Sequence, residues 1–204
     1  MDHDELVRLY GPWRARTPDD VVDLFRGYSP PWWIAGGWAI EAFVGSSRPH
    51  GDIDPSIPRA DVSDLLRHLR SGWDVWAADR GSLTPLTEVD AGIPDTCSNL
   101  WLRKSGADPW EYDVILMDTS EGFWTYKRDA RVNLPSDEIL WERDGIRYLR
   151  PEIQLLHKAP GLRPQDQRDF ASSVPLLGPD AIHWLRSALT TAHPGHPWIT
   201  LLDR

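Results

Sequence analysis

The sequence has only one cysteine, Cys97, among its 204 residues. A single thiol excludes an intramolecular disulfide and any metal site built from several cysteines. We therefore expect a reducing, intracellular setting. The 41% of hydrophobic residues is enough to build a core without such crosslinks.

Excess positive charge is also missing. The 22 lysines and arginines are outnumbered by 31 acidic residues, which gives a net charge of −9 at pH 7. Binding to a nucleic-acid backbone depends on clustered Lys and Arg side chains that replace counterions, so we do not expect nucleic acid as a partner. A cationic small molecule is the better electrostatic match for an acidic cleft.

Long apolar segments are the third absence. No stretch is apolar enough over the length of a membrane-spanning helix, so we expect no membrane partner. The acidic start MDHDELVRLY lacks the basic start and the apolar run of a secretory signal. These features favour a cytoplasmic protein.

The hydrophobic pattern predicts an α+β fold in two parts. Residues 1–150 alternate between helical and strand-like spacing, which indicates an α/β domain, and residues 151–204 have the pattern of a helical region. Turn-forming residues predict a loop over 79–100. Helices are expected at 16–28, 38–45, 59–72, 150–159, 163–177 and 179–192, and strands at 30–35, 52–57, 73–78, 100–104 and 110–118.

The short segment HGDID, residues 50–54, contains two aspartates that could bind a metal ion. On a strand, Asp52 and Asp54 would point the same way, about 6.6 Å apart, with one residue between them. Read by themselves, the neighbouring Gly51 and Pro55 favour a solvated turn instead.

The sequence before this segment changes the interpretation. A strand, the pair Gly36 and Gly37, a helix and then Asp-x-Asp follow one another in WWIAGGWAIEAFVGSSRPHGDID. This order resembles the nucleotidyltransferase superfamily, which has a polymerase-beta-like fold, and most closely its small-molecule group of aminoglycoside and lincosamide nucleotidyltransferases. The segments GIRYLRPEIQLLHKA, RPQDQRDF and PGHPW resemble the helical half of that group. The resemblance implies a nucleotidyltransferase-like mixed sheet flanked by helices, followed by a C-terminal helical region.

The resemblance also implies an activity. Enzymes of this group transfer a nucleoside monophosphate, here AMP with ATP as the expected donor, to a hydroxyl of a small molecule such as an aminoglycoside or lincosamide antibiotic. Two Mg²⁺ ions can clamp the attacking and leaving oxygens, and Mg²⁺ prefers carboxylate and phosphate oxygens. The alternatives are a toxin-like nucleotidyltransferase that modifies RNA or protein, and a catalytically degraded fold that only binds a ligand.

Three carboxylates are the expected catalytic groups and metal ligands. The resemblance assigns Asp52 and Asp54 to this role and requires a third acid on a neighbouring strand. The segment WEYDVILMD offers Glu111 and Asp113 with same-face spacing, and YDVIL is the better match to the family, so Asp113 is the prediction. The structural alternative for Asp113 is an ion pair with an arginine.

Five residues are the expected nucleotide contacts. Gly36 and Gly37 would let the backbone approach a phosphate at the start of a helix. By resemblance, Arg48 and His50 lie near the triphosphate, although a purely structural hydrogen bond is equally expected for His50. Lys158 would reach the triphosphate from the helical region, and its alternative is a solvated helix lysine.

The acceptor site is less well defined by the sequence. Glu88, Asp90 and Glu111 are candidate contacts to a cationic acceptor, although an acidic residue in a loop is more commonly only solvated. Arg163 and Asp166 are expected to tie helices together by capping and ion pairing rather than to touch a substrate.

Four residues depart from the family pattern: Pro55 and Ser56 after the second aspartate, Trp38 after the glycine pair, and His157. Pro55 stands where the family continues its metal-binding strand with an apolar residue, and proline cannot donate to a sheet. The strand should therefore lie at an edge, end early or bulge there. His157 occupies a position where an aromatic or aliphatic residue is common.

Overall fold

A computed structural model describes residues 3–89 and 92–203. Asp90, one of the predicted acceptor contacts, lies outside the described residues. The chain forms two compact units, each assembled from two separate segments. The first comprises residues 1–34 and 49–117, and the second comprises residues 35–48 and 118–204. The predicted domain boundary at residue 150 stays a prediction.

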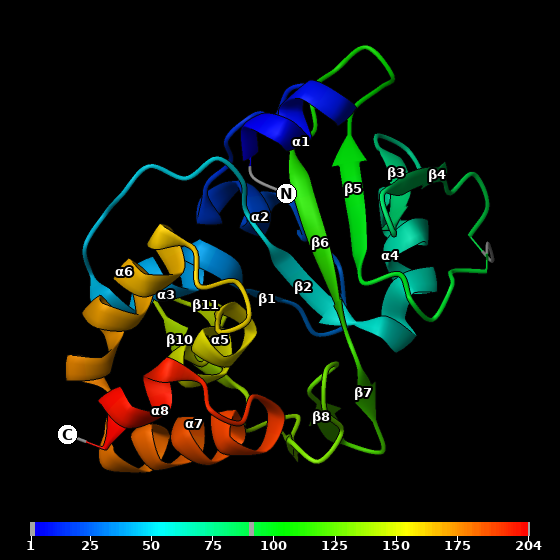
Figure 1. The fold of residues 1–204 in the computed structure, drawn as a ribbon. Coiled ribbons are helices and arrows are strands. Elements are labelled where there is room, and N and C mark those ends of the chain that lie inside the picture. Colours follow the sequence, from blue (N-terminus) through cyan, green and yellow to red (C-terminus); the bar gives the residue numbers. More distant parts are fainter. Residues whose placement is uncertain (1–2, 90–91, 204) are drawn as a thin grey trace. The chain divides into compact units, whose positions relative to one another are not determined.

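The first unit contains a mixed sheet. Its strands lie in the order β1-β2-β6-β5-β3-β4; among these strands the β2–β6 pair is parallel and the other pairs are antiparallel. In Figure 1, β2, β6 and β5 run side by side through this unit. The strands are β1 (Trp33–Ile34), β2 (Pro55–Pro58), β3 (Asp74–Asp79), β4 (Ser82–Pro85), β5 (Asn99–Arg103) and β6 (Tyr112–Met117).

Helices of the first unit follow local sequence signals. They are α1 (His3–Tyr10), α2 (Pro18–Leu24), the 3-10 turn η1 (Arg59–Asp61) and α4 (Val62–Leu69). Thr17 caps α2 through a capping box with Asp20, as its sequence predicts. The predicted apolar side of α4 is buried at Leu65, Leu66 and Leu69.

The two faces of this sheet differ in chemistry. Residues that alternate along the strands are buried on one face, including Val75, Leu100, Leu102, Val114 and Leu116. The opposite face carries Asn99, Trp101 and Asp113, since Asn99 pairs with Ile115 and Trp101 with Asp113 in the antiparallel register. Polar chemistry is therefore gathered on one face of the first unit.

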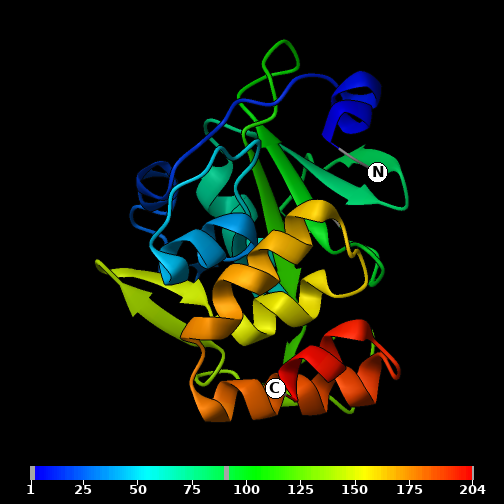
Figure 2. The ribbon, with the colours of Figure 1, turned by 60° about the vertical axis from the view of Figure 1, so that its left-hand side comes forward.

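The second unit combines short strands with most of the helices. The strands β7 (Thr119–Ser120), β8 (Phe123–Thr125) and β9 (Asn133–Pro135) form an antiparallel sheet, and β10 (Leu140–Arg143) pairs with β11 (Ile146–Leu149) as a hairpin. The helices are α3 (Gly36–Val44), α5 (Pro151–Lys158), α6 (Pro164–Ser173), η2 (Val174–Leu176), α7 (Pro179–Ala192) and α8 (Pro197–Leu202). Figure 2 shows α3, α5 and α6 packed together, with α7 beside α8.

Burial explains the packing of these helices. Apolar side chains of α5 and α7 are buried, among them Ile153, Leu156 and Leu185. The ring of Phe170 on α6 stacks on Trp198 of α8 at 4.2 Å, and the Trp198 indole donates a 2.9 Å hydrogen bond to Gln167. Aromatic pairs of this kind add to the stability that area burial provides.

The predicted fold class is confirmed: the protein has a mixed sheet, flanking helices and only helices among its described residues after 150. Several elements were missed or misplaced. The loop predicted over 79–100 contains β4, and the expected 30–35 strand is reduced to two residues. The helices α1 and α8 and the strands β7–β11 were not predicted, because they are short or lack a regular apolar pattern.

Candidate active site

Asp52 and Asp54 lie directly before strand β2 instead of on it. The strand begins at Pro55, so the expected strand start at residue 52 was wrong. A proline can occupy the first residue of a strand, where the missing N–H is tolerated. Ile53 is fully buried, whereas Asp52 is exposed and Asp54 is half-buried. The two aspartates thus avoid the core that holds the residue between them.

The register of the sheet brings Asp54 beside Asp113. In the parallel β2–β6 pair, Ser56 is opposite Ile115, and the same offset two residues earlier places Asp54 opposite Asp113. The amide of Asp113 donates a 3.3 Å hydrogen bond to the carbonyl of Ile53, which extends the pairing to this point. Residues opposite each other in a sheet project to the same face, so the register puts the two carboxylates on one side of the sheet.

Asn99 orients the carboxylate of Asp113. Its side-chain amide on β5 donates a 2.8 Å hydrogen bond to Asp113 Oδ1. An amide donor fixes a carboxylate oxygen without adding a positive charge. Sequence reasoning missed Asn99, although it alternates with Trp101 and Arg103 along a strand and so shares their face.

A cavity of about 270 Å³ is lined by Asp113; we call it the Asp113 pocket. Asn99, Trp101 and Asp113 contribute from the sheet, and the turn of the β3–β4 hairpin contributes Arg80 and Gly81 with their neighbours. Tyr10, the last residue of α1, also lines it. Ligand pockets combine apolar walls with a few polar groups in this way.

Glu111, two residues before Asp113, is engaged by arginines. Its carboxylate is fully buried and pairs with Arg14 at 3.4 Å and with Arg16, whose Nε donates a 2.8 Å hydrogen bond. A buried carboxylate requires such partners, because burial of an unpaired charge is costly. These contacts favour a structural role for Glu111, and its role as an acceptor contact stays a prediction.

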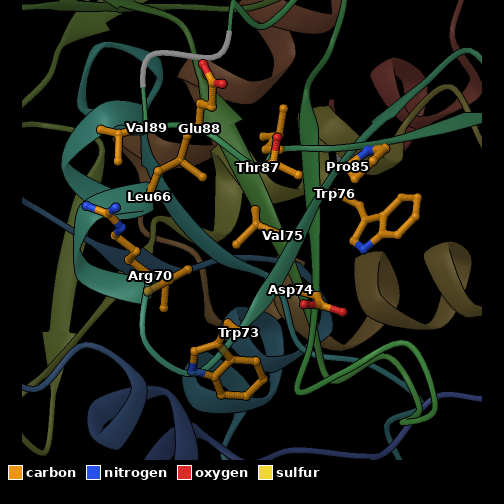
Figure 3. A pocket seen from close by; sticks show the side chains of 12 residues that line it. Leu66, Arg70, Trp73, Asp74, Val75, Trp76, Pro85, Thr87, Glu88 and Val89 are labelled. Atoms are coloured by element: carbon orange, nitrogen blue, oxygen red, sulfur yellow. The ribbon is translucent and has the colours of Figure 1, made fainter.

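Glu88 lines a different cavity. That cavity, of about 560 Å³, lies between α4, strand β3 and residues 85–89 and includes Leu66, Trp73 and Val75 (Figure 3). Asp113 is not among the residues lining it. The structure therefore does not bring Glu88 together with the acidic pair.

The glycine pair begins helix α3 in the second unit. Gly36 has a φ of 68°, a conformation that glycine adopts without steric cost. Its amide donates a 2.7 Å hydrogen bond to the side chain of Gln154 on α5, which is itself buried. The Gly36 amide is thus used inside the second unit. The nucleotide-binding role of Gly36 and Gly37 stays a prediction.

Lys158 belongs to a buried cluster of charges. Its ammonium group lies 2.9 Å from Asp169 and 3.5 Å from Asp166, and the three side chains are 9% exposed or less. Arg48 reaches Asp169 at 3.6 Å, and its own amide donates a hydrogen bond to Glu41. Lys158 is therefore not a solvated helix lysine, and its predicted contact to a triphosphate is not tested by this arrangement.

Arg163 and Asp166 confirm the expected capping arrangement at the start of α6. Asp166 accepts hydrogen bonds from the Arg163 backbone and guanidinium at 3.1 and 2.9 Å. Burial by itself would raise the pKa of Asp166, but the hydrogen bonds from Arg163 and the charge of Lys158 hold it below its ordinary value. The carboxylate is thus ionised and structural.

His157 takes the place of an aromatic side chain, next to Lys158 on α5. Its ring lies 5.8 Å from that of Trp124 and 5.2 Å from that of Tyr126. Burial, with smaller effects from Lys127 and Arg128, lowers the pKa of His157 to about 3. The imidazole is neutral at neutral pH and packs as a ring.

His50, the histidine predicted to lie near the triphosphate, is half-buried in the first unit.

The donor chemistry of the acidic residues suits magnesium. Within residues 3–89 and 92–203, no three histidine, cysteine, aspartate or glutamate side chains are grouped as a metal site. Magnesium, however, uses one or two protein carboxylates together with waters and substrate phosphates. The register pair of Asp54 and Asp113 fits such a set.

None of the helices in the described part of the chain has the length and apolar composition needed to cross a membrane.

Comparison with known proteins shows a family match and several similar folds. Residues 19–77 match the family of aminoglycoside-2''-adenylyltransferases. The lincomycin-bound crystal structure of lincosamide antibiotic adenylyltransferase LnuA is similar with a TM-score of 0.50 and 20% identity, over 76% of this chain and 92% of LnuA. The chain has the fold of the antibiotic nucleotidyltransferases.

Two structures of the antibiotic-resistance factor ANT(2'')-Ia share this nucleotidyltransferase fold. Its solution structure gives a TM-score of 0.53 and 17% identity, over 84% of this chain and 88% of that one. Its crystal structure in complex with adenylyl-2''-tobramycin gives a TM-score of 0.51 and 18% identity, over 83% of this chain and 92% of that one. No curated protein sequence matches significantly. The resemblance to nucleotidyltransferase enzymes that the sequence predicted is confirmed by the family match and the fold.

Proposed function

We propose that this protein transfers a nucleoside monophosphate, with ATP as the donor, to a hydroxyl of a small-molecule antibiotic. The fold and the family match support nucleotidyl transfer to antibiotics. The donor nucleotide, the need for Mg²⁺ and the acceptor are the parts of the proposal that require experiment.

One observation carries the proposal: Asp113 on strand β6 lines a cavity, and the register of β2 and β6, continued two residues before β2, puts Asp54 at the level of Asp113. A hydroxyl bound in that pocket would lie near the carboxylates that must manage its proton and the reacting phosphate. Asn99 keeps Asp113 Oδ1 in a fixed position for this purpose.

Asp52, Asp54 and Asp113 are the residues that would hold Mg²⁺. When bound, the ion supplies charge neutralisation for the phosphate oxygens of the donor. The proposed roles of Gly36, Gly37, Arg48, His50 and Lys158 toward the nucleotide rest on the resemblance alone.

The acceptor is proposed to enter the Asp113 pocket. In the related structures, LnuA holds lincomycin and ANT(2'')-Ia holds adenylyl-2''-tobramycin. These two antibiotic classes define the first acceptors to try. A pocket of about 270 Å³ suits one ring of such a molecule, with the remainder outside.

The proposal is tested by incubating the protein with ATP, Mg²⁺ and a panel that includes tobramycin and lincomycin. We expect acceptor-dependent release of pyrophosphate and an adenylylated product in mass spectrometry. Asp52→Asn should abolish release, because a neutral amide is a poor Mg²⁺ ligand. Asp95→Asn, the same change at an exposed loop residue, serves as the matched control.

Absence of pyrophosphate release with every acceptor would contradict the transfer function. Calorimetry with ATP, with and without Mg²⁺, then identifies the alternative. ATP binding that does not depend on the metal, without transfer, would instead support a catalytically degraded fold that acts as a binding module.

A further inference from the structure

We propose that Tyr10 is the residue that selects the acceptor, by closing one wall of the Asp113 pocket against a sugar-like ring. This inference rests on the proposed function, since it concerns the acceptor of the same site. It adds a specificity-determining residue from a part of the chain that precedes the family match at residues 19–77.

Tyr10 is held in place at three points. Its hydroxyl donates a 2.7 Å hydrogen bond to the carbonyl of Gly81, at the turn of the β3–β4 hairpin. Its own carbonyl accepts a 2.8 Å hydrogen bond from the indole of Trp110. Its ring packs edge-on against Trp101 at 5.3 Å. The side chain therefore spans from the sheet to the hairpin.

The segment after Tyr10 is anchored to the sheet as well. Trp110 donates a 2.9 Å backbone hydrogen bond to Pro12, and Arg14 donates one of 2.7 Å to Trp110. Trp13 forms a parallel bridge with Trp110 and packs against Trp101 at 5.1 Å. A wall that is already fixed before binding loses little entropy when a ligand arrives, which favours selection by fit.

The lining of the pocket indicates which chemical group fits. Tyr10 and Trp101 provide aromatic surface, and Asn99 and Asp113 provide hydrogen-bonding groups. A saturated sugar ring has an apolar C–H face and hydroxyl groups at its rim. Its C–H face would contact the aromatic wall while a hydroxyl points to Asp113, which is the group that the proposed reaction must modify.

Removal of the ring and removal of the hydroxyl distinguish the two parts of this role. Tyr10→Ala deletes the wall, and Tyr10→Phe deletes only the hydrogen bond to Gly81. Tyr28→Phe is the matched control, because the Tyr28 hydroxyl donates a 3.3 Å hydrogen bond to the carbonyl of Asp61, and Tyr28 does not line the pocket. Thermal unfolding of every variant establishes that it is folded.

Binding is measured by calorimetric titration with tobramycin and lincomycin without ATP, and the KM values for acceptor and ATP are measured in turnover. For whichever acceptor binds, we expect Tyr10→Ala to raise its Kd and KM about tenfold, with the KM for ATP unchanged. Tyr10→Phe should raise them about twofold to threefold, and Tyr28→Phe should change neither.

The outcomes separate this inference from the proposed function. An unchanged acceptor Kd and KM in folded Tyr10→Ala would overturn the inference and leave nucleotidyl transfer intact. Equal increases in the KM for acceptor and for ATP would also overturn it, because a purely structural role predicts that pattern. Binding that depends on Tyr10 without any transfer would support the acceptor site and contradict the function. Failure of both acceptors to bind the wild-type protein would overturn the inference.

Discussion

Asp52 and Asp113 of the first unit and Asp166 and Asp169 of the second unit have the same side chain in different settings. In the second unit, Asp166 and Asp169 are buried and paired with cations, including Lys158 at 2.9 Å from Asp169. In the first unit, Asp52 is exposed, and Asp113 is half-buried and oriented by a neutral amide.

This difference suggests a stabilising role for the aspartates of the second unit and a role in the proposed reaction for those of the first. Carboxylates that are buried with partner cations contribute through a fixed geometry, and removal of one partner leaves an uncompensated charge. Asp113 instead lines a cavity, where its carboxylate can reach a ligand. We therefore expect substitutions in the two units to affect different measurements.

The largest effect is expected at Asp113. Asp113→Asn should lower turnover on the order of 10²–10³-fold, the typical loss when one charge-stabilising group of an active site is removed. Steady-state pyrophosphate release measures this, with Asp95→Asn as the control. Turnover within twofold of the wild type would remove Asp113 from the catalytic set.

In the second unit, Asp169→Asn should lower the free energy of unfolding by about 3–5 kcal/mol, since Lys158 and Arg48 lose their charged partner. Urea unfolding followed by tryptophan fluorescence measures the change. Normal stability together with lost ATP binding would contradict the structural role and favour the nucleotide contact predicted for Lys158.

Glu111→Gln tests whether the carboxylate two residues before Asp113 is purely structural. We expect a loss of about 2 kcal/mol in the free energy of unfolding, because Arg14 and Arg16 lose a charged hydrogen-bond acceptor. The acceptor KM should stay unchanged. A higher KM with normal stability would restore the predicted acceptor role of Glu111.

Gly161→Ala tests the close packing around the charge cluster. A Cβ atom at residue 161 would lie 2.8 Å from Asp166 Oδ2, so the carboxylate would have to move. We expect a loss of about 1–2 kcal/mol in urea unfolding. Gly178→Ala is the control, because an added Cβ there meets no atom within 4 Å. Equal effects of the two substitutions would exclude this explanation.

His157→Phe should have the smallest effect, visible as a change in pH dependence. The pKa of His157 is lowered to about 3 from 6.5, so its contribution to stability is complete above 6.5 and is lost as the pH falls below that value. Between about pH 7.5 and pH 5.5 this loss amounts to about 1 kcal/mol. The free energy of unfolding, measured at the higher and the lower pH, should decrease less for the variant than for the wild type. An identical decrease in the two proteins would contradict this prediction.

Local rules made part of the fold predictable from the sequence. Thr17 caps α2, and Gly45 ends α3 with a φ of 75°, because capping depends only on residues within one turn. The hairpin of β5 and β6 follows from alternating apolar residues around a turn-forming segment. Strand β4 was missed because Ser82–Pro85 is largely exposed and lacks that alternation.

The sequence also identified the acidic residues of the candidate site, but the partner of each polar group was decided by tertiary structure. Asp54 meets Asp113, 59 positions later, only through the register of β2 and β6. The Gly36 amide donates a hydrogen bond to Gln154, and Lys158 lies beside Asp166 and Asp169. Local propensity specifies which residues can form a helix or a strand, whereas register and burial depend on the packing of side chains far apart in the chain. For that reason the sequence indicated the resemblance and the candidate carboxylates, and only the folded chain placed Asn99 and Tyr10 at the same pocket.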